Sequence, residues 1–388
     1  MKSKSEESKK QVVFEEISFG VDMGGTVWAV STNSGAGKPL SYRAYRDHGG
    51  LRKEEIFYRE LKKHIDLGRK AHVYYEAGRY GFSPARIMMG IGADVTIVPV
   101  SKLEIYSCGK RVKTDRLDSR ILANLKQYCA KVPSVYIPTL EEEEKRSSER
   151  ERERLNAEIK RLNSQMISIV ERTELPTPCS HKTSKGWREW LQRLDKTGEI
   201  SKLPRTDKRR FSNFLEELIL FEKQQKSWDE FIEKELETER AQEKEKGRHS
   251  IYEMLISFKG IGPAIARHLS WEIGDFRRFR NGKAFGSYFG LTSCHYSSGN
   301  MDRDQGIAKK GRSSLRRMAI EMAWLFVRHQ ASCWAVKKWA PELEKKGRNR
   351  RKAIVALARQ LLVALWRHIV YGEEIKGAII KRLQKADA

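Results

Sequence analysis

The sequence has few cysteines and no long apolar run. Its five cysteines, among 388 residues, are scattered, odd in number and never arranged as Cys-x-x-Cys. This pattern argues against a disulfide framework and a zinc site, and it fits a reducing compartment. Nowhere do eighteen apolar residues follow one another, and the opening MKSKSEESKKQ contains no apolar signal segment. We therefore expect a soluble cytoplasmic protein with no membrane segment.

Acidic residues are also too few to balance the basic ones. The chain has 51 Asp and Glu against 76 Lys and Arg, a formal net charge of +25. Such an excess implies a polyanionic partner, nucleic acid first, with a merely basic housekeeping protein as the alternative. The length allows two or three domains. We predict a disordered tail (1–14), an α/β domain (15–138), a helical arm (139–248) and a mainly helical domain (249–388).

Carboxylates stand at element ends in the first domain. Apolar runs at 17–33, 71–78 and 93–100 predict strands, and 54–65 has helical spacing. Asp22 interrupts the first run and Glu76 ends the second. Asp115 and Asp118 share one face of a predicted helix because they are three residues apart.

These four carboxylates predict a divalent metal site. Oxygen ligands suit Mg²⁺, with Mn²⁺ as a substitute, and Mg²⁺ keeps waters that a phosphate substrate can replace. Each acid alone also has an explanation without a metal, because β-turns and the N-terminal ends of helices favour acidic residues. GVDMGGT is similar as well to the phosphate turn of sugar kinases and actin, but the second glycine-rich turn that a kinase needs is missing.

The arm is predicted to be a coiled coil. Two apolar seams with steps of four and three support this: Leu155, Ile159, Leu162, Met166 and Ile169, then Phe214, Leu218, Phe221, Gln225, Trp228 and Ile232. The two helices can pair antiparallel within one chain or associate between chains. The segment between them, Pro176 to Arg210, is basic and bounded by proline.

The last domain contains a predicted helix-hairpin-helix. KGIG stands between two helical patterns, so Lys259, Gly260 and Gly262 are candidate phosphate contacts at a helix N-terminus. A glycine-rich turn before Pro263 without any nucleic-acid role is the alternative. The amphipathic helices that follow are expected to hold their tryptophans in the core: Trp324, Trp334, Trp339 and Trp366.

Two adjacent serines precede a cluster of cations. Ser297 and Ser298 stand before Gly299 in a turn-prone segment, and either an active-site loop or an ordinary polar loop fits these letters. The candidate nucleic-acid contacts, for which a solvated surface is the alternative, are Lys110, Arg111 and Lys113 in the first domain, and Lys309, Lys310, Arg312, Arg316 and Arg317 after the serines.

At this point the chain resembles a known family. GVDMGG, YYEAG and VKTDRLDSRILA, followed by KGIGPAIARHL, EIGDFRRF, FGSYFGLTSCHYSSG and GIAKKG, look like the DEDD transposases of the insertion sequence one-hundred-and-ten family and the related Piv-type invertases. The resemblance covers roughly Ile17 to Tyr136 and Ile251 to Arg328. The chain departs from it at Gly24 and Gly25, where members often have a lysine soon after the first aspartate.

The resemblance implies a RuvC-like, ribonuclease H-like N-terminal domain, a coiled-coil arm and a C-terminal transposase domain. By residue-by-residue match, the metal-binding acids are Asp22, Glu76, Asp115 and Asp118, and the nucleophile is Ser298, the serine directly before the glycine. The activity implied is Mg²⁺-dependent transposition or site-specific recombination through a covalent DNA-serine intermediate. Donor and target DNA, a structured guide RNA and a dimer or tetramer with composite sites are implied partners, in a bacterial or archaeal nucleoid.

Three alternatives remain at this level. A DNA invertase without an RNA guide would have the same motifs. A metal-only nuclease would use the acids to activate water and leave Ser298 as a loop residue. A nucleic-acid-binding scaffold would have no catalytic activity.

Overall fold

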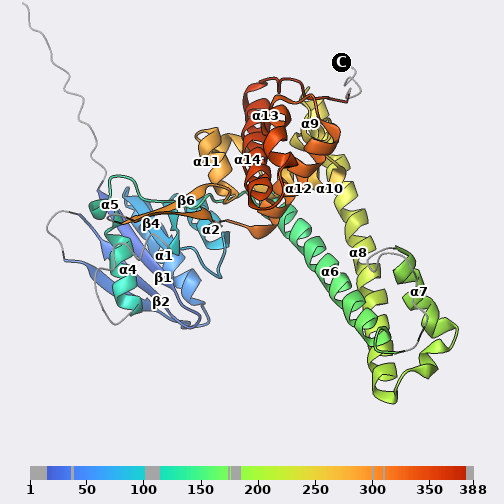
Figure 1. The fold of residues 1–388 in the computed structure, drawn as a ribbon. Coiled ribbons are helices and arrows are strands. Elements are labelled where there is room, and N and C mark those ends of the chain that lie inside the picture. Colours follow the sequence, from blue (N-terminus) through green and yellow to red (C-terminus); the bar gives the residue numbers. More distant parts are fainter. Residues whose placement is uncertain are drawn as a thin grey trace, which may run out of the picture. The chain divides into compact units, whose positions relative to one another are not determined.

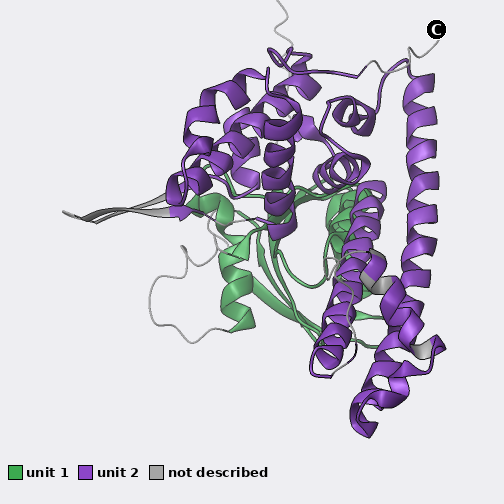
Figure 2. Ribbon diagram, turned by 45° about the vertical axis from the view of Figure 1, so that its right-hand side comes forward, with its two compact units in different colours: residues 1–139 green, residues 140–388 purple. Residues whose placement is uncertain are grey.

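A computed structural model describes residues 15–35, 39–100, 114–173, 175, 185–298, 301–308 and 311–381. The chain divides into two compact units, residues 1–139 and 140–388, shown separately coloured in Figure 2. The predicted tail, residues 1–14, lies outside the described part. The predicted arm and C-terminal domain both belong to the second unit.

The first unit is built on a five-stranded mixed sheet (Figure 1). Its strands are β1 (Glu16–Met23), β2 (Trp28–Asn33), β3 (Ser41–Tyr45), β4 (Lys70–Glu76) and β5 (Asp94–Val98), in the order β3-β2-β1-β4-β5. β1, β2 and β3 pair antiparallel, whereas β4 runs parallel to both β1 and β5. The α/β class predicted for this part of the chain is confirmed.

Helices cover both faces of this sheet. On one face, α1 (Lys53–Asp66) and α2 (Ser83–Ile91) bury Phe57 and Met88 against alternate strand residues such as Phe19. On the other, α4 (Asp115–Ala123) and α5 (Leu125–Tyr128) pack Leu122 and Leu125 against Tyr74 and Val98. Because successive strand residues point to opposite faces, neighbouring residues of one strand serve different cores.

α4 lies unusually close to β1 because Gly20 has no side chain. A Cβ at this position would lie 2.1 Å from the Ser119 carbonyl oxygen and 2.3 Å from the Ala123 nitrogen. The hydroxyls of Ser119 and Ser31 are 2.8 Å apart in the buried interface and tie α4 to β2. Gly20 therefore sets the distance between the sheet and α4.

We expect Gly20→Ala to destabilise the first unit by about 2–3 kcal/mol, because the added methyl group overlaps helix backbone that cannot move alone. Thermal unfolding of the full chain should show the transition of this unit lowered by at least about 4 °C. Gly90→Ala is the matched control: its Cβ would meet nothing within 4 Å, and in α2 it should stabilise by about 0.5–1 kcal/mol. Equal behaviour of the two variants would contradict this account of the packing.

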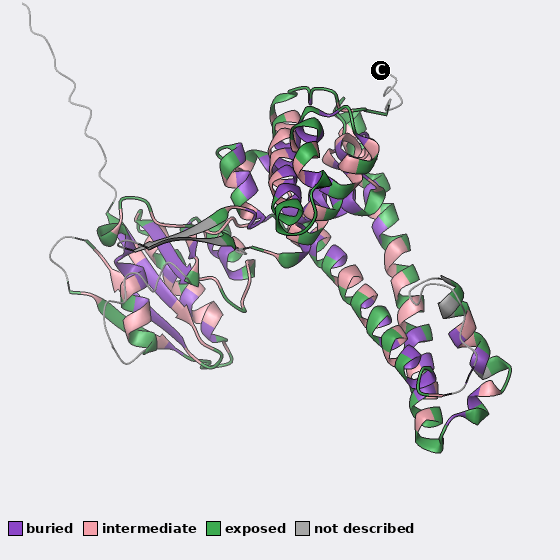
Figure 3. Cartoon of the chain, viewed as in Figure 1, coloured by how far each residue is buried: buried purple, intermediate pink, exposed green. Residues whose placement is uncertain are grey.

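The arm of the second unit is an antiparallel pair of long helices, α6 (Leu140–Val170) and α8 (Arg205–Glu245). Asn156 accepts a hydrogen bond from Gln225, and Arg152 pairs with Asp229, so residue numbers rise on one helix as they fall on the other. The five predicted seam residues of α6 are all buried. Figure 3 shows buried, intermediate and exposed positions alternating along the arm helices. On the predicted second seam, Leu218 and Ile232 are buried, Phe214 and Phe221 pack partly buried against the same cluster, and Gln225 bonds to α6. The seam also contains residues that were not predicted, namely buried Phe211, Leu215 and Leu236.

Between the arm helices lie α7 (Lys185–Lys196) and the short η1 (Glu199–Lys202). Their apolar residues Leu191, Leu194 and Ile200 join the distal end of the seam in one cluster. The helices of the coiled coil therefore pair within one chain, which is one of the two arrangements that the sequence left open.

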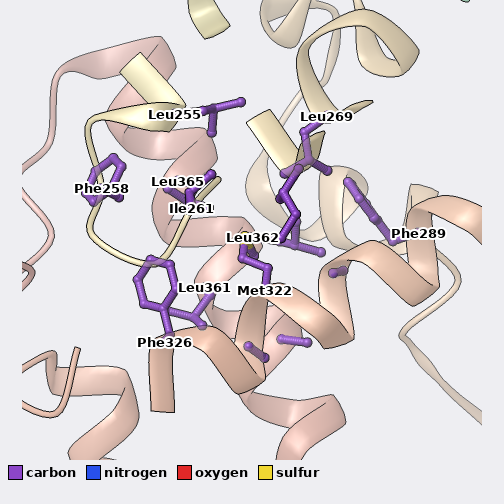
Figure 4. Packing of buried hydrophobic residues seen from close by; sticks show 14 of the residues in the cluster. Leu255, Phe258, Ile261, Leu269, Phe289, Met322, Phe326, Leu361, Leu362 and Leu365 are labelled. Carbon is purple, nitrogen blue, oxygen red and sulfur yellow. The ribbon is translucent and has the colours of Figure 1, made fainter. Parts of the chain in front are cut away.

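The rest of the second unit is a helical body around one core. Its elements are α9 (Ile251–Ile256), α10 (Pro263–Ile273), η2 (Phe276–Arg278), α11 (Gly282–Tyr288), β6 (Ser293–Ser298), β7 (Met301–Ile307), α12 (Ser313–His329), α13 (Trp334–Glu344) and α14 (Arg348–Tyr371). Figure 4 shows Leu361, Leu362 and Leu365 of α14 among Met322 and Phe326 of α12.

The expectation that four tryptophans fill this core was wrong for two of them. Trp366 is buried and Trp339 packs partly against the core, but Trp324 and Trp334 are 36% and 41% exposed. Trp324 lies beneath the guanidinium of Arg350, 5.0 Å from its ring centroid. An amphipathic helix can carry an aromatic residue at the edge of its apolar face, and periodicity alone does not distinguish this position from the centre.

Helix α14 is, within the described ranges, long and apolar enough by length and composition to be a candidate membrane span. Eight of its residues are buried in the core, Trp366 and Leu365 among them. The core helix of a folded domain has the same composition, so this single helix is weak evidence for a membrane.

A buried ionic cluster joins the arm to the body. Glu149 of α6 is 1% exposed and lies between two residues of α10: Arg267 Nε donates to it at 2.8 Å, and His268 Nδ1 is 3.3 Å away. Burial alone would raise the pKa of Glu149, but the His268 hydrogen bond and the Arg267 charge outweigh it and hold the pKa below its ordinary value. Arg150, the next residue of α6, donates two N–H groups to Glu272, which lies one turn beyond His268 on α10.

We expect Glu149→Gln to destabilise the arm-body junction by about 3–5 kcal/mol at neutral pH, because Arg267 would stay buried without its counter-charge. A depressed carboxyl pKa stabilises above its unfolded value and is lost as pH falls through the folded value, so the deficit should shrink below about pH 4.5. Hydrogen exchange of α6 and α10 between pH 3 and 7 measures it, after correction for the intrinsic exchange rate.

The control for this junction is Glu151→Gln, which breaks an exposed α6 pair with Arg154 and should cost less than about 1 kcal/mol. If both variants change α6 protection equally, the buried cluster does not hold the junction.

Candidate active site

Two of the predicted acids lie side by side at strand ends. The parallel register of β1 and β4 pairs Gly20 with Tyr74 and Val21 with Tyr75, so Asp22 and Glu76 are the next residues on neighbouring strands. Gly20 and Tyr74 face α4, and side chains two residues apart share a face of the sheet. Asp22 and Glu76 therefore lie on the α4 side, where both are partly exposed.

The other two acids lie in the first turn of α4. Thr114 caps this helix by accepting a hydrogen bond from the Leu117 amide at 3.3 Å. Asp115 is exposed and Asp118 is half-buried; their spacing puts them on the same side of α4 as buried Ser119 and Leu122, which contact the sheet. Negative charge is favourable at this end of a helix.

The register and the helix spacing thus place Asp22, Glu76 and Asp118 on the side where the sheet and α4 meet, with exposed Asp115 at the start of that helix. Their oxygen donors are chemically suited to Mg²⁺ or Mn²⁺. In the described ranges, however, no three His, Cys, Asp or Glu side chains converge closely enough to hold one ion. Metal binding by these residues stays a prediction.

An arginine that the sequence analysis did not single out lies beside these strand ends. A Cβ at Gly25 would be 2.6 Å from Nη2 of Arg79, so the guanidinium rests against the β1–β2 turn. Tyr80 holds the loop in place: its hydroxyl donates to the Gly24 carbonyl at 2.6 Å, and its ring lies 5.2 Å from the Arg79 guanidinium carbon. The sequence contained one indication of this arrangement, because the paired glycines after Asp22 leave room for a guanidinium group.

The predicted serine lies at the end of a β-hairpin in the second unit. Ser298 is the last residue of β6, and its backbone pairs with Met301 of β7; residues 299–300 and the side chains of 294–298 are outside the described part. The turn-prone segment predicted here is therefore largely strand. Ile307 anchors the hairpin base in the core, and the Ala308 amide donates to the Thr292 carbonyl at 2.8 Å.

The KGIG segment forms the tight turn between α9 and α10. Gly260 has φ +94°, and a Cβ there would lie 3.2 Å from the Leu325 carbonyl oxygen, so glycine is required for packing against α12. Gly262 caps α10, and Pro263 and Ala264 after it are exposed, so the N-terminus of α10 is open to a ligand. Lys259 is exposed beside it.

Two of the predicted cations are already paired within the second unit. Arg312 and Arg317 both bind Glu153 of α6, at 2.9 and 3.1 Å, and Arg312 also donates to the Ser314 hydroxyl. Arg316 is half-buried on α12. The remaining predicted cations lie outside the described residues: Lys110, Arg111, Lys113, Lys309 and Lys310.

Comparison with known proteins gives similarities along most of the chain. A family model described as "Transposase IS116/IS110/IS902 family" matches residues 252–338. The chain is 30% identical over 396 residues to "Putative transposase y4rJ" of Sinorhizobium fredii, covering 94% of each protein.

Shorter similarities extend to two other relatives. The "Pilin gene-inverting protein" of Moraxella bovis is 31% identical over 112 residues, 28% of this chain and 34% of that protein. The "Transposase for insertion sequence element IS1111A" of Coxiella burnetii is 32% identical over 112 residues, 28% of this chain and 30% of that protein.

Proposed function

The chain belongs to the IS116/IS110/IS902 transposase family, and we propose that it cuts and rejoins DNA with a serine nucleophile and a carboxylate-held metal ion. Family membership implies DNA substrates. The main support for this metal-assisted mechanism is the pairing of β1 with β4. This pairing gives Asp22 and Glu76 neighbouring positions on the face of the sheet that α4 covers, and α4 carries Asp115 and Asp118. A RuvC-like, ribonuclease H-like first unit is supported by the strand order and by β1–β3 pairing antiparallel beside parallel β4 and β5.

Ser298 is the proposed nucleophile. Its Oγ would attack a DNA phosphorus, forming an Oγ–P bond while the bond from phosphorus to a deoxyribose oxygen breaks. The serine proton leaves, and the released sugar oxygen takes up a proton. The number of phosphodiester bonds is unchanged, so a second sugar hydroxyl can reverse the step and join new strands without a high-energy cofactor.

Asp22, Glu76, Asp115 and Asp118 are the residues that would hold Mg²⁺ or Mn²⁺. Such an ion, when bound, polarises the phosphate and stabilises charge on the attacking and leaving oxygens. Arg79, against the turn after Asp22, would hold a phosphate oxygen through its paired N–H groups. Lys259 and the N-terminus of α10 would bind a phosphate elsewhere on the DNA, as in a helix-hairpin-helix.

We expect wild-type protein incubated with its DNA and Mg²⁺ to give a covalent protein-DNA adduct on a denaturing gel, and Ser298→Ala to give none. Ser297→Ala is the matched control, because it removes the neighbouring hydroxyl and should keep the adduct. Asp115→Asn and chelation of the metal should each abolish the adduct while DNA binding persists.

The outcomes of that experiment separate the alternatives. Cleavage by Ser298→Ala would mean a metal-only nuclease in which the acids activate water. DNA binding without Mg²⁺-dependent cleavage of any substrate would mean a non-catalytic scaffold.

A structured guide RNA and a homodimer or tetramer with composite sites complete the proposal. The charge of +25 supports an RNA partner, and the acids and serine belong to different units, which suits sharing between protomers. We expect sequencing of nucleic acid that copurifies with the full chain to return one structured non-coding RNA. Random cellular RNA, or none, would favour a DNA invertase without a guide.

A further inference from the structure

The second unit contains a large groove that the proposed function leaves unused. It has a volume of about 990 Å³ and follows α14 to the base of the β6–β7 hairpin, where Ser293, Gly306 and Ile307 line it. Apolar residues of α14 line its length: Val355, Ala356, Val363 and Ala364. Ser298 lies five residues farther along β6 than Ser293, about 17 Å of extended strand.

Cations follow this groove along α14. The five that line it are Arg348, Arg351, Lys352, Arg359 and Arg367. At 1.5 Å per residue, Arg348 and Arg367 are about 28 Å apart along the helix. Arg367 pairs with Glu373 at 3.8 Å. Within the described part of the chain, the side chains of Arg348, Arg351 and Arg359 make no hydrogen bond or ion pair.

An exposed aromatic ring also lines the groove, and Glu373 and Glu374 line it at the end of α14 that carries Arg367. Trp334 is 41% exposed, and its backbone amide donates to the Lys376 carbonyl at 3.1 Å, which fixes the start of α13 beside the groove. A buried position would satisfy a large apolar ring better than water does, so the exposure of this ring in a groove that arginines also line needs a reason. A ligand with both flat apolar faces and negative charges supplies one.

Single-stranded DNA has this combination. Its phosphates match a row of cations, and its unpaired bases can lie on an apolar floor and stack on an aromatic ring. Duplex DNA presents phosphates to the groove but has no unpaired base that could stack on Trp334. An acidic polypeptide offers charge without the flat faces.

We propose that the α14 groove binds single-stranded DNA, namely the unpaired strand that continues from the phosphate at Ser298. This inference rests on the proposed function, which requires strands to separate and exchange beside the serine. The groove would hold the displaced strand while its partner is joined.

The test measures binding of a labelled single-stranded DNA oligonucleotide to the full chain by fluorescence anisotropy, in a Ser298→Ala background that cannot cleave. We expect the double change Arg348→Ala with Arg351→Ala to weaken binding at least about tenfold near 0.1 M salt and to reduce the slope of log K against log salt by about 1.4. Trp334→Ala should weaken binding about fivefold or more, and Trp334→Phe by about twofold or less.

The matched control is Arg205→Ala with Arg209→Ala, which removes two exposed arginines from the first turns of α8 at the far end of the arm. It should leave the affinity within about twofold of the parent's, with a salt slope no steeper than the parent's. Thermal unfolding must give the same midpoint for the groove variants and the parent. Duplex DNA should be insensitive to Trp334→Ala.

Three results would overturn the inference. The groove variants could bind single-stranded DNA as well as the arm control does. They could lose only the affinity for an RNA of the same sequence, which would make RNA the occupant. An acidic peptide could compete for the groove while DNA does not. None of these results depends on cleavage, so the inference can fail while the Ser298 mechanism stands, and the adduct experiment can fail independently.

Discussion

The pairing of β1 with β4 is the constraint on which the candidate site depends. Side chains alternate along a strand, so the register that buries Val21 and Tyr75 against α1 and α2 also sends Asp22 and Glu76 to the α4 side. A slip of one residue in either strand would turn its carboxylate into that aromatic core. The apolar packing of one face thus positions the acids on the other.

The two units hold their helices in place by different means. In the first, α4 approaches the sheet through the missing side chain of Gly20, and the contact is set by shape. In the second, α6 meets α10 through Glu149 and Arg150, whose partners have fixed directions. An apolar seam alone tolerates sliding of one helix on another, whereas directional ion pairs specify the rotation and height of α6. The β6–β7 hairpin that carries Ser298 is anchored in the helical body to which α10 also belongs.

The net charge shows what amino-acid composition can predict about binding partners and what it cannot. The surplus of 25 positive charges predicts a polyanion, but it does not distinguish a cation bound by an acid from one left open. Arg312 and Arg317 were singled out by their place after the serines, yet both bind Glu153. Arg348 and Arg351 stand in an ordinary amphipathic helix and line a groove instead. Pairing depends on residues more than a hundred positions away, which no local pattern contains.

The sequence by itself determined four of the five strands of the sheet, all but β3, together with the four acids at element ends, the α6 seam and the family. Each depends on neighbouring residues: alternation, a spacing of three or four, or a short motif. Only the tertiary structure decided that the arm helices pair within one chain, that Arg79 rests against Gly25, and that exposed Trp334 lines the same groove as Arg348 and Arg351. Each of these features brings together segments that are far apart in the sequence. Its energy depends on which surfaces meet once the whole core has folded, and no local pattern contains that information.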